Sequence, residues 1–505
     1  MGQRFSRLFL FVLIITAVAK GGAFLPAYSI DDYLFVLRDF PSLSMLRQGR
    51  FGQAVLLQIL HLIQLEPNYA RVFFVSFALI ASSLLAALVV RHWHVGRAGW
   101  LPVAAASVVA THPFTTEIFT FRTALGISMW AFALLALLLV PLRWSLAGLL
   151  GGAVIFALAL SIYQVVLNYC LMIILISAAI GLTRLLVVGS AAGWPARVTS
   201  LLSLRRAVRH RTTALLACAT LGTIIYLVTN AVIVRALRIT MASRTQFLSP
   251  DRIGERVEAV WQVVRYRFLE VSPLLGRFLK GLLLLLLVTA LAGLMARMRP
   301  WLRPWPLLLL LTVVSLLAVS LIWTVGVIVI LEEFWAVPRV MAHVGIFWAG
   351  ILVISHRCSS AGTRPALGVL SLLIVLSFIG SSNRILHDQI RLNARDMSKA
   401  TRILARLESL PGFSGTELVA VQGTPWSYPL SYTTLDRDMN ISAFGARWSK
   451  VAILREVSGY DLKPAEDDAQ QATAEAYCRG ARPWPGPDSV TLKDGLAIVC
   501  LGIPH

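Results

Sequence analysis

Residues 70–90 read ARVFFVSFALIASSLLAALVV, a run in which Arg71 is the one charged side chain. A helix of about 20 apolar residues crosses the roughly 30 Å hydrocarbon core of a bilayer. Similar runs, two of them shorter, occur at 8–27, 98–113, 123–140, 145–162, 165–187, 213–234, 274–296, 305–330, 339–356 and 365–381. The sequence therefore predicts an all-α polytopic membrane bundle with about eleven spans, the first of them uncleaved.

The composition is that of a protein dissolved in lipid. Apolar residues make up 57% of the chain and charged residues only 14%, and the mean hydropathy is +0.74. A soluble globular domain of this length could not keep so much apolar surface out of water. The net charge of +21 would suit nucleic acid, but the arginines lie between the apolar runs and do not form one stripe. We therefore expect membrane lipids around the chain and no nucleic-acid partner.

Basic and acidic residues fall at opposite ends of the predicted spans. With a cytoplasmic N-terminus, the inner loops contain no Asp or Glu, and these loops are 91–97, 141–144, 184–211, 297–304 and 356–364. Loops rich in Lys and Arg stay in the cytoplasm by the positive-inside rule. The sequence therefore predicts a multi-pass protein of a bacterial inner membrane with an extracytoplasmic, periplasmic C-terminus.

The segments outside the predicted spans suggest two domains. We assign residues 1–383 to the membrane domain, with large outer loops at 28–69 and 235–273. The first of these loops becomes amphipathic, which is typical of a helix along the membrane surface. Residues 384–505 have the composition of a small soluble α+β domain outside the membrane.

Turn residues and cysteines predict the details of this C-terminal domain. Its first helix should end at Pro411-Gly412, and strands are expected at 417–421 and 490–501, the latter folded into a hairpin at Lys493-Asp494-Gly495. Cys478 and Cys500 both fall in this domain, in a compartment that permits oxidation. A disulfide between them is expected; two buried thiols are the alternative.

Asp31 and Asp32 form an acidic pair directly after the first predicted span. Adjacent carboxylates at the mouth of a membrane cavity can act as a general base, ligate a divalent cation such as Mg²⁺ or Mn²⁺, or bind sugar hydroxyls. The pair alone is a weak signal, because an Asp that caps a helix beginning at Tyr33 would explain one of the two.

Other polar residues lie near the outer ends of the spans. Arg50, Arg122 and Arg339 could each grip a phosphate bidentately, with snorkelling to lipid headgroups as the alternative. Glu117 and the pair Tyr163-Gln164 lie beside outer turns, where a substrate role competes with simple solvation of the loops. A reaction at this face is far from cytosolic nucleotides, so its activated substrate must arrive on a lipid.

The order of these features resembles a known family. Asp31-Asp32, then Gln48-Gly49-Arg50, Pro113 with Glu117, and Tyr163-Gln164 are similar in order and topology to the type-II glucosyltransferases of bacterial and phage O-antigen modification. The likeness covers the membrane region and extends to Cys500. One departure is visible, because the family commonly has an Arg three or four residues after the acidic pair, where this chain has Phe35 and Val36.

The resemblance implies a glycosyltransferase of the GT-C architecture that takes a hexose such as glucose from a polyprenyl-phosphate donor to a lipid-linked or surface glycan. Either Asp31 or Asp32 would be the base in a direct displacement at the anomeric carbon. Positive charge from Arg50, Arg122 or Arg339, or from a divalent ion on the acidic pair, would stabilise the leaving phosphate.

Two other classes of protein compete with this interpretation. A transporter or flippase for lipid-linked sugars would place polar groups at mid-membrane in broken helices, often in repeated halves. A structural or assembly factor would explain the C-terminal domain but not the acidic pair.

Overall fold

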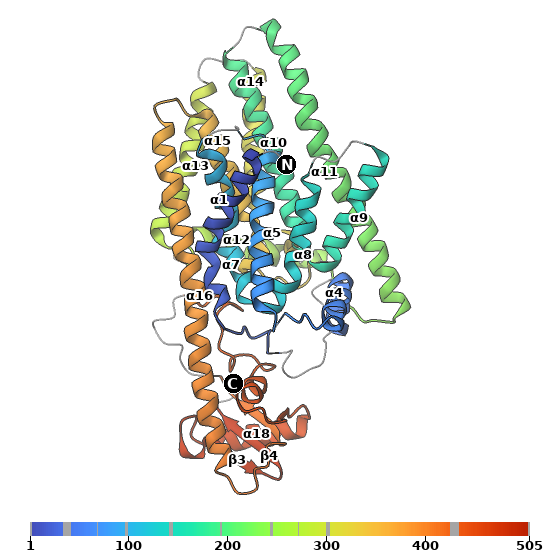
Figure 1. Cartoon of the computed structure of the whole chain (residues 1–505), viewed down its shortest axis with the longest axis vertical. Helices are drawn as coiled ribbons and strands as arrows, with labels where there is room; N and C mark the ends of the chain where they lie inside the picture. Colours follow the sequence, from blue (N-terminus) through green and yellow to red (C-terminus); the bar gives the residue numbers. More distant parts are fainter. Residues whose placement is uncertain are drawn as a thin grey trace. The chain divides into compact units, whose positions relative to one another are not determined.

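The structure is a computed structural model, and it is mostly helical with a small sheet near the C-terminus (Figure 1). It describes residues 3–33, 42–67, 69–95, 99–140, 145–191, 194–242, 246–270, 272–298, 304–424 and 434–502. The α-helices before residue 240 are α1 (Gln3–Lys20), α3 (Ser42–Arg47), α4 (Phe51–Leu62), α5 (Arg71–His92), α6 (Leu101–Thr111), α7 (Pro113–Thr120), α8 (Arg122–Leu138), α9 (Leu146–Ile162), α10 (Val166–Ala191) and α11 (Trp194–Ala236).

The later elements include the sheet. The helices are α12 (Ile253–Val264), α13 (Arg277–Met298), α14 (Pro304–Ile322), α15 (Val344–Cys358), α16 (Arg364–Glu408), α17 (Lys450–Ser458) and α18 (Asp468–Gly480). The strands are β1 (Leu418–Gln422), β2 (Lys463–Pro464), β3 (Val490–Lys493) and β4 (Leu496–Cys500).

The chain divides into two compact units, which we call the bundle unit and the C-terminal unit. The bundle unit comprises residues 1–22, 42–119 and 124–383. The C-terminal unit comprises residues 384–505 together with two short pieces, 23–41 and 120–123. The second unit therefore takes in the segment that carries the acidic pair.

Seven helices in the described part of the chain are long and apolar enough to cross a membrane. They cover Gln3–Phe24, Arg71–His92, Val166–Val187, Arg211–Ala236, Arg277–Ala296, Pro338–Cys358 and Arg364–Glu408. Four other predicted spans correspond to shorter apolar helices, at Leu101–Thr111, Leu125–Leu138, Leu146–Ile162 and Leu310–Val325. The helical membrane-type bundle is confirmed, whereas the count of eleven spans stays a prediction.

Helix α15 forms the centre of the bundle unit. Nearly all of its residues are buried, and it packs against α6, α10 and α13. Around it, helices such as α1 expose large apolar side chains, including Phe11, Ile14 and Val18. An apolar surface of this extent needs a nonaqueous environment, so the bundle has the properties of a membrane protein.

Two segments of the bundle unit that were expected to be outer loops contain helices. In the stretch predicted to be amphipathic, α4 buries Leu57 and Leu60, exposes Gln58 and His61, and packs against α9. The predicted loop 235–273 contains α12, whose Arg256 donates hydrogen bonds to the Ile328 and Glu332 carbonyls.

The C-terminal unit is built around the four-stranded sheet, in the order β2-β1-β4-β3. Strands β1 and β4 are parallel, and β3 and β4 form the predicted antiparallel hairpin. Asp494 and Gly495 both have positive φ angles at its turn, as a two-residue hairpin loop of this kind requires. Helices α16 and α17 bury one side of the sheet through a core that includes Leu404, Phe444 and Ile453.

Helix α16 is continuous over 45 residues and enters both units. The sequence predicted a span at 365–381 followed by a separate soluble helix. No proline or glycine occurs between residues 381 and 408, so nothing in the chain interrupts the helix there. It ends at Glu408, shortly before Pro411-Gly412, as predicted.

Candidate active site

The acidic pair lies in a turn of the C-terminal unit. The Asp32 N–H donates to the Ser29 carbonyl at 3.2 Å and closes this turn. Of residues 29–33, only Asp31 is partly exposed, and the other four are buried. Tyr33 packs into the core of the unit, and the residues after it, where a helix capped by the pair would lie, fall outside the described residues. The turn thus presents one carboxylate and buries the other.

The carboxylate of Asp32 accepts five hydrogen bonds. Its Oδ2 accepts from the backbone N–H and the hydroxyl of Ser29, both at 2.8 Å, and from the Arg122 N–H at 3.2 Å. Its Oδ1 accepts from the N–H and the hydroxyl of Thr123, at 3.0 and 3.1 Å. Arg122 and Thr123 begin α8, so Asp32 satisfies amides that have no partner within the helix. Asp32 therefore joins two distant segments of the chain.

Helix α16 holds both of these segments. Asn393 donates to the Tyr28 carbonyl at 2.8 Å, just before the turn. Gln389 donates to the Thr120 carbonyl at 2.5 Å, just before α8. The two donors are one helical turn apart on α16, so this helix fixes the position of the acidic turn.

The Arg122 side chain lies beside the acidic turn. Its Nε donates to the Ala27 carbonyl at 2.8 Å, and its guanidinium carbon lies 3.9 Å from the centroid of the Tyr28 ring. Burial raises the pKa of Tyr28, and the charge of Arg122 acts in the opposite direction. The predicted arginine and the acidic pair therefore belong to the same small substructure.

The hydrogen bonds of Asp32 bear on the predicted divalent cation. A carboxylate has about four lone-pair sites, and five donors already occupy those of Asp32. Within the described ranges, no three His, Cys, Asp or Glu side chains gather as a metal site would need. Asp32 does not fit the role of a metal ligand, and we derive no step through a cation.

In the bundle unit, Arg50, Tyr163 and Gln164 lie together. The Arg50 Nε donates to the Gln164 Oε1 at 3.2 Å, and its guanidinium lies 5.5 Å from the Tyr163 ring centroid. Gln164 also donates to the Gln48 carbonyl at 3.0 Å and to the Tyr226 hydroxyl at 3.1 Å. Adjacent Gly49 has a φ of +70°, and a Cβ there would lie 2.8 Å from the Tyr226 hydroxyl.

Glu117 and Arg339 form a buried ion pair in the same unit. The Arg339 Nη1 lies 2.6 Å from the Glu117 Oε1, and the backbone N–H of Arg339 donates to the other carboxylate oxygen. The Glu117 side chain is fully buried and that of Arg339 is 16% exposed. Glu117 therefore fixes the segment that carries Arg339, which simple solvation of a loop would not do.

The charges of both groups, Arg50 and the Glu117–Arg339 pair, act on the hydroxyl of Tyr163. Burial raises the pKa of its hydroxyl, whereas the charges of Arg339 and Arg50 lower it and the charge of Glu117 raises it. Four of the residues predicted from the sequence thus share one neighbourhood, with two arginines and one carboxylate around a tyrosine. This neighbourhood has the positive charge that an anionic group would need.

Three residues that sequence reasoning missed lie in these neighbourhoods. Tyr226 contacts Gln164 as described, but in sequence it looks like any residue of an apolar span. Arg267 is buried, donates to the Ala336 carbonyl at 3.2 Å and lies over the Phe114 ring. Lys20 is fully buried and donates to the Thr115 hydroxyl. It was detectable, because it is the one charged residue in the run 8–27.

Comparison with known families decides the class of protein. The profile of the family described as Glucosyl transferase GtrII matches residues 23–349, well over half of the chain. The chain belongs to this family. The resemblance seen in the sequence is therefore confirmed, and the protein is a glycosyltransferase of glucose. No curated protein and no solved structure matches the chain significantly.

For this glucosyltransferase, the matched region contains the acidic turn together with Arg50, Glu117, Tyr163, Gln164 and Arg339. It ends before α16 and the strands. The chemistry is therefore to be sought in residues 23–349, although α16 supports the acidic turn from outside this range.

Proposed function

We propose that the chain transfers glucose from a polyprenyl-phosphate donor to a lipid-linked or surface glycan at the outer face of the inner membrane. Membership of the glucosyltransferase family supports the transfer of glucose. The lipid donor is supported by the apolar, membrane-type helices, the first of which precedes the acidic pair in the chain. Sugar nucleotides are absent from the outer face, so the sugar must cross the membrane on a carrier.

The observation that carries the proposal is the unequal environment of the acidic pair. Asp32 is buried and its carboxylate accepts five hydrogen bonds, so it has a structural task. Asp31 lies next to it with a partly exposed side chain. We assign Asp31 as the general base and Asp32 as the residue that positions it.

The proposed reaction is a direct displacement. The Asp31 carboxylate takes the proton of the acceptor hydroxyl while the hydroxyl oxygen attacks the anomeric carbon. The bond between that carbon and the phosphate oxygen breaks, and the lipid phosphate leaves with the electron pair. Phosphate is a good leaving group, so no general acid is needed.

Arginine side chains would stabilise the charge on the leaving phosphate. Arg50 and Arg339 both act electrostatically on Tyr163, and Arg122 is fixed beside the acidic turn. A guanidinium that is already positioned loses little conformational freedom when it binds phosphate. Its stabilisation of the phosphate grows in the transition state, because negative charge develops there. We propose Arg50, Arg122 and Arg339 as donor-binding residues, with Glu117 holding Arg339 in place.

The transporter alternative makes a different prediction about the sugar. A flippase would move a lipid-linked sugar without cleaving it, whereas a transferase breaks the bond to phosphate. The family assignment favours cleavage.

Membranes containing the chain distinguish these possibilities. They should transfer radiolabelled glucose from polyprenyl-phosphate glucose to extracted surface glycan, and polyprenyl phosphate should appear in equal amount. Under the same conditions UDP-glucose should be inactive without an enzyme that makes the lipid donor. Transfer directly from UDP-glucose, or movement of intact lipid-linked glucose without cleavage, would contradict the proposal.

A further inference from the structure

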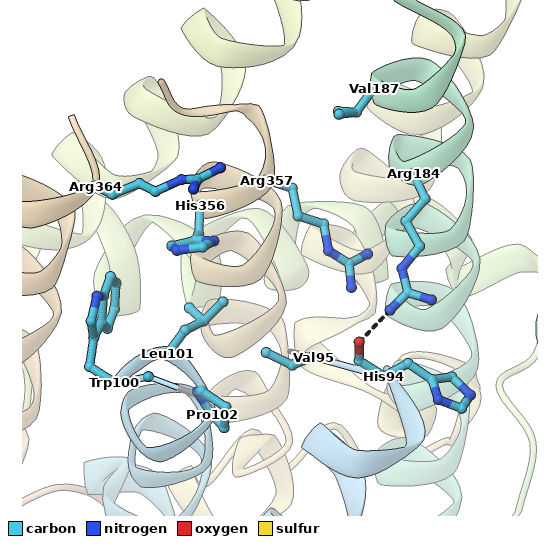
Figure 2. Close-up of a pocket in the computed structure, with 11 residues that line it drawn as sticks. His94, Val95, Trp100, Leu101, Pro102, Arg184, Val187, His356, Arg357 and Arg364 are labelled. Carbon is cyan, nitrogen blue, oxygen red and sulfur yellow. Dashed lines mark hydrogen bonds between the residues drawn. The ribbon is translucent and has the colours of Figure 1, made fainter. Parts of the chain in front are cut away.

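A cavity of about 440 Å³ opens at one end of the bundle unit (Figure 2). Its walls come from the residues after α5, the start of α6, the C-terminal part of α10, the end of α15 and the first residue of α16. The segments at this end are the arginine-rich, acid-free loops that the sequence assigns to the cytoplasm. None of the predicted substrate-binding residues lines this cavity.

Positive charge dominates the lining of the cavity. Arg184, Arg357 and Arg364 all line it, together with His356 and His94. No Asp or Glu is found among the lining residues in the described part of the chain. In Figure 2 the side chains of Arg184 and Arg357 extend from facing helices into the same space.

Two of these arginines are held by backbone carbonyls, which carry no charge. Arg184 donates to the carbonyls of Trp93 and His94, at 2.5 and 2.6 Å. Arg357 donates to the Ile180 carbonyl at 3.2 Å and to the Trp93 carbonyl at 3.4 Å. The carbonyls orient the guanidinium groups but do not neutralise them.

Two of the cations lie close together. Arg184 and Arg357 both donate to the Trp93 carbonyl, so their guanidinium groups are neighbours. Like charges held together in a partly buried site repel strongly. An anion in the cavity would remove this repulsion and accept charge-assisted hydrogen bonds.

The remaining wall is apolar and suits a lipid. Trp100, Leu101 and Pro102 line the cavity at the start of α6, and the Trp100 and His356 rings lie 5.5 Å apart, edge to face. Basic pockets between membrane helices at the cytoplasmic side are typical sites for anionic lipid headgroups.

We propose that this cavity binds the phosphate group of an acidic phospholipid from the leaflet at this end of the bundle. The phosphate lies between Arg184 and Arg357, with Arg364 at the exposed edge, and the glycerol contacts the wall formed by Trp100 and Leu101. The site is separate from glucosyl transfer, and it anchors the inner ends of α10, α15 and α16 to the membrane.

The test measures the thermal unfolding of the purified full-length protein in a neutral detergent. Phosphatidylglycerol is titrated in, with phosphatidylcholine and inorganic phosphate as separate arms. Phosphatidylglycerol should raise the unfolding temperature at concentrations where the other two have little effect. In Arg357→Gln and Arg364→Gln, the concentration needed for half of the effect should increase roughly tenfold, because each loses a charge-assisted contact.

Arg277→Gln is the matched control, because Arg277 is an exposed arginine at the start of α13 and does not line the cavity. It should respond to phosphatidylglycerol as the parent does. Arg364 is exposed, so its variant should fold and remains informative should Arg357→Gln not accumulate. Equal protection by phosphatidylcholine, or an unchanged response in Arg364→Gln, would overturn the proposal. Equal protection by inorganic phosphate would replace the lipid with a soluble phosphate.

Discussion

Asp31 and Asp32 are adjacent in the chain, yet their surroundings give them different chemistry. Asp32 accepts five hydrogen bonds in a buried turn, whereas the side chain of Asp31 is partly exposed. The lone pairs of Asp32 already accept from these donors, which leaves little capacity to accept from a substrate hydroxyl. A base must also reach the acceptor hydroxyl. The partly exposed side chain of Asp31 meets this requirement.

Replacement of Asp32 by Asn should destabilise the protein. The new NH₂ group would face N–H and O–H donors at one of the two oxygen positions. We expect a loss of about 1–3 kcal/mol, because a buried donor is left without an acceptor. Thermal unfolding in detergent measures it, with Asp251→Asn at an exposed outer position as the control. An Asp32→Asn protein as stable as the parent would show that the five bonds contribute little.

The buried pair of Glu117 and Arg339 gives a second prediction. Glu117→Ala leaves the Arg339 charge without its carboxylate in a largely buried position. Loss of one partner of a buried pair costs about 3–5 kcal/mol, so the variant should accumulate poorly and unfold at a lower temperature. Glu66→Ala is the control, because Glu66 pairs with His61 at the surface. Normal accumulation and unfolding of Glu117→Ala would contradict a structural role for this pair.

The sequence patterns selected candidate site residues, but they did not predict which residues these would contact. Arg50, Glu117, Tyr163 and Arg339 were each selected because they lie near the outer ends of apolar runs. The structure brings Arg50 to Tyr163 and Glu117 to Arg339 across segments far apart in the chain, and no periodicity predicts such long-range contacts. The capping of α8 by Asp32 was missed for the same reason, since the donors are some 90 residues away.

At the scale of elements, local turn signals were sufficient for the hairpin of β3 and β4. Asp494-Gly495 encodes the two positive φ angles directly. The two-residue strand β2 had no such signal, because it is defined by its pairing with β1. The continuity of α16 was missed because a change from apolar to polar residues suggested a boundary, although the helix needs only residues that tolerate helical geometry.

The disulfide between α18 and β4 can be tested directly. Cys478 and Cys500 form a disulfide with a Cα–Cα distance of 5.4 Å, while Cys170, Cys218 and Cys358 are buried thiols. Peptide mass mapping without reduction should recover the linked pair from freshly prepared protein. Replacement of both by Ser should cost the C-terminal unit about 3 kcal/mol. Free thiols at both positions would refute the bond.

For the whole molecule, apolar runs predicted membrane-type helices, and the number of spans stays a prediction. Four runs correspond to apolar helices of 10–17 residues in the described part of the chain. A run of apolar residues shows where lipid is tolerated and not where a helix begins and ends. Their orientation rests on the charges of the loops.

Topology is therefore the prediction for the whole chain. Asp31, Glu117, Glu332 and His505 should face outward, and Arg91, Arg97, Arg209 and Arg299 should face the cytoplasm; of these, His505, Arg97 and Arg299 lie outside the described residues. Cysteines introduced at exposed Asp251 and Ser360 should react with an impermeant maleimide from the outer and inner side respectively. A C-terminal reporter that is active only in the cytoplasm would reverse the assignment.

The most direct test of the account is glucose transfer by Asp31→Asn. This variant keeps the size and much of the hydrogen bonding of the side chain but removes the basic carboxylate. Membranes with matched amounts of parent, Asp31→Asn and Asp251→Asn are supplied with polyprenyl-phosphate [¹⁴C]glucose and acceptor glycan. Asp31→Asn should accumulate normally and transfer glucose roughly 100-fold more slowly, on the order of 3 kcal/mol in the barrier, while Asp251→Asn matches the parent. Full activity of Asp31→Asn would show that the base lies elsewhere.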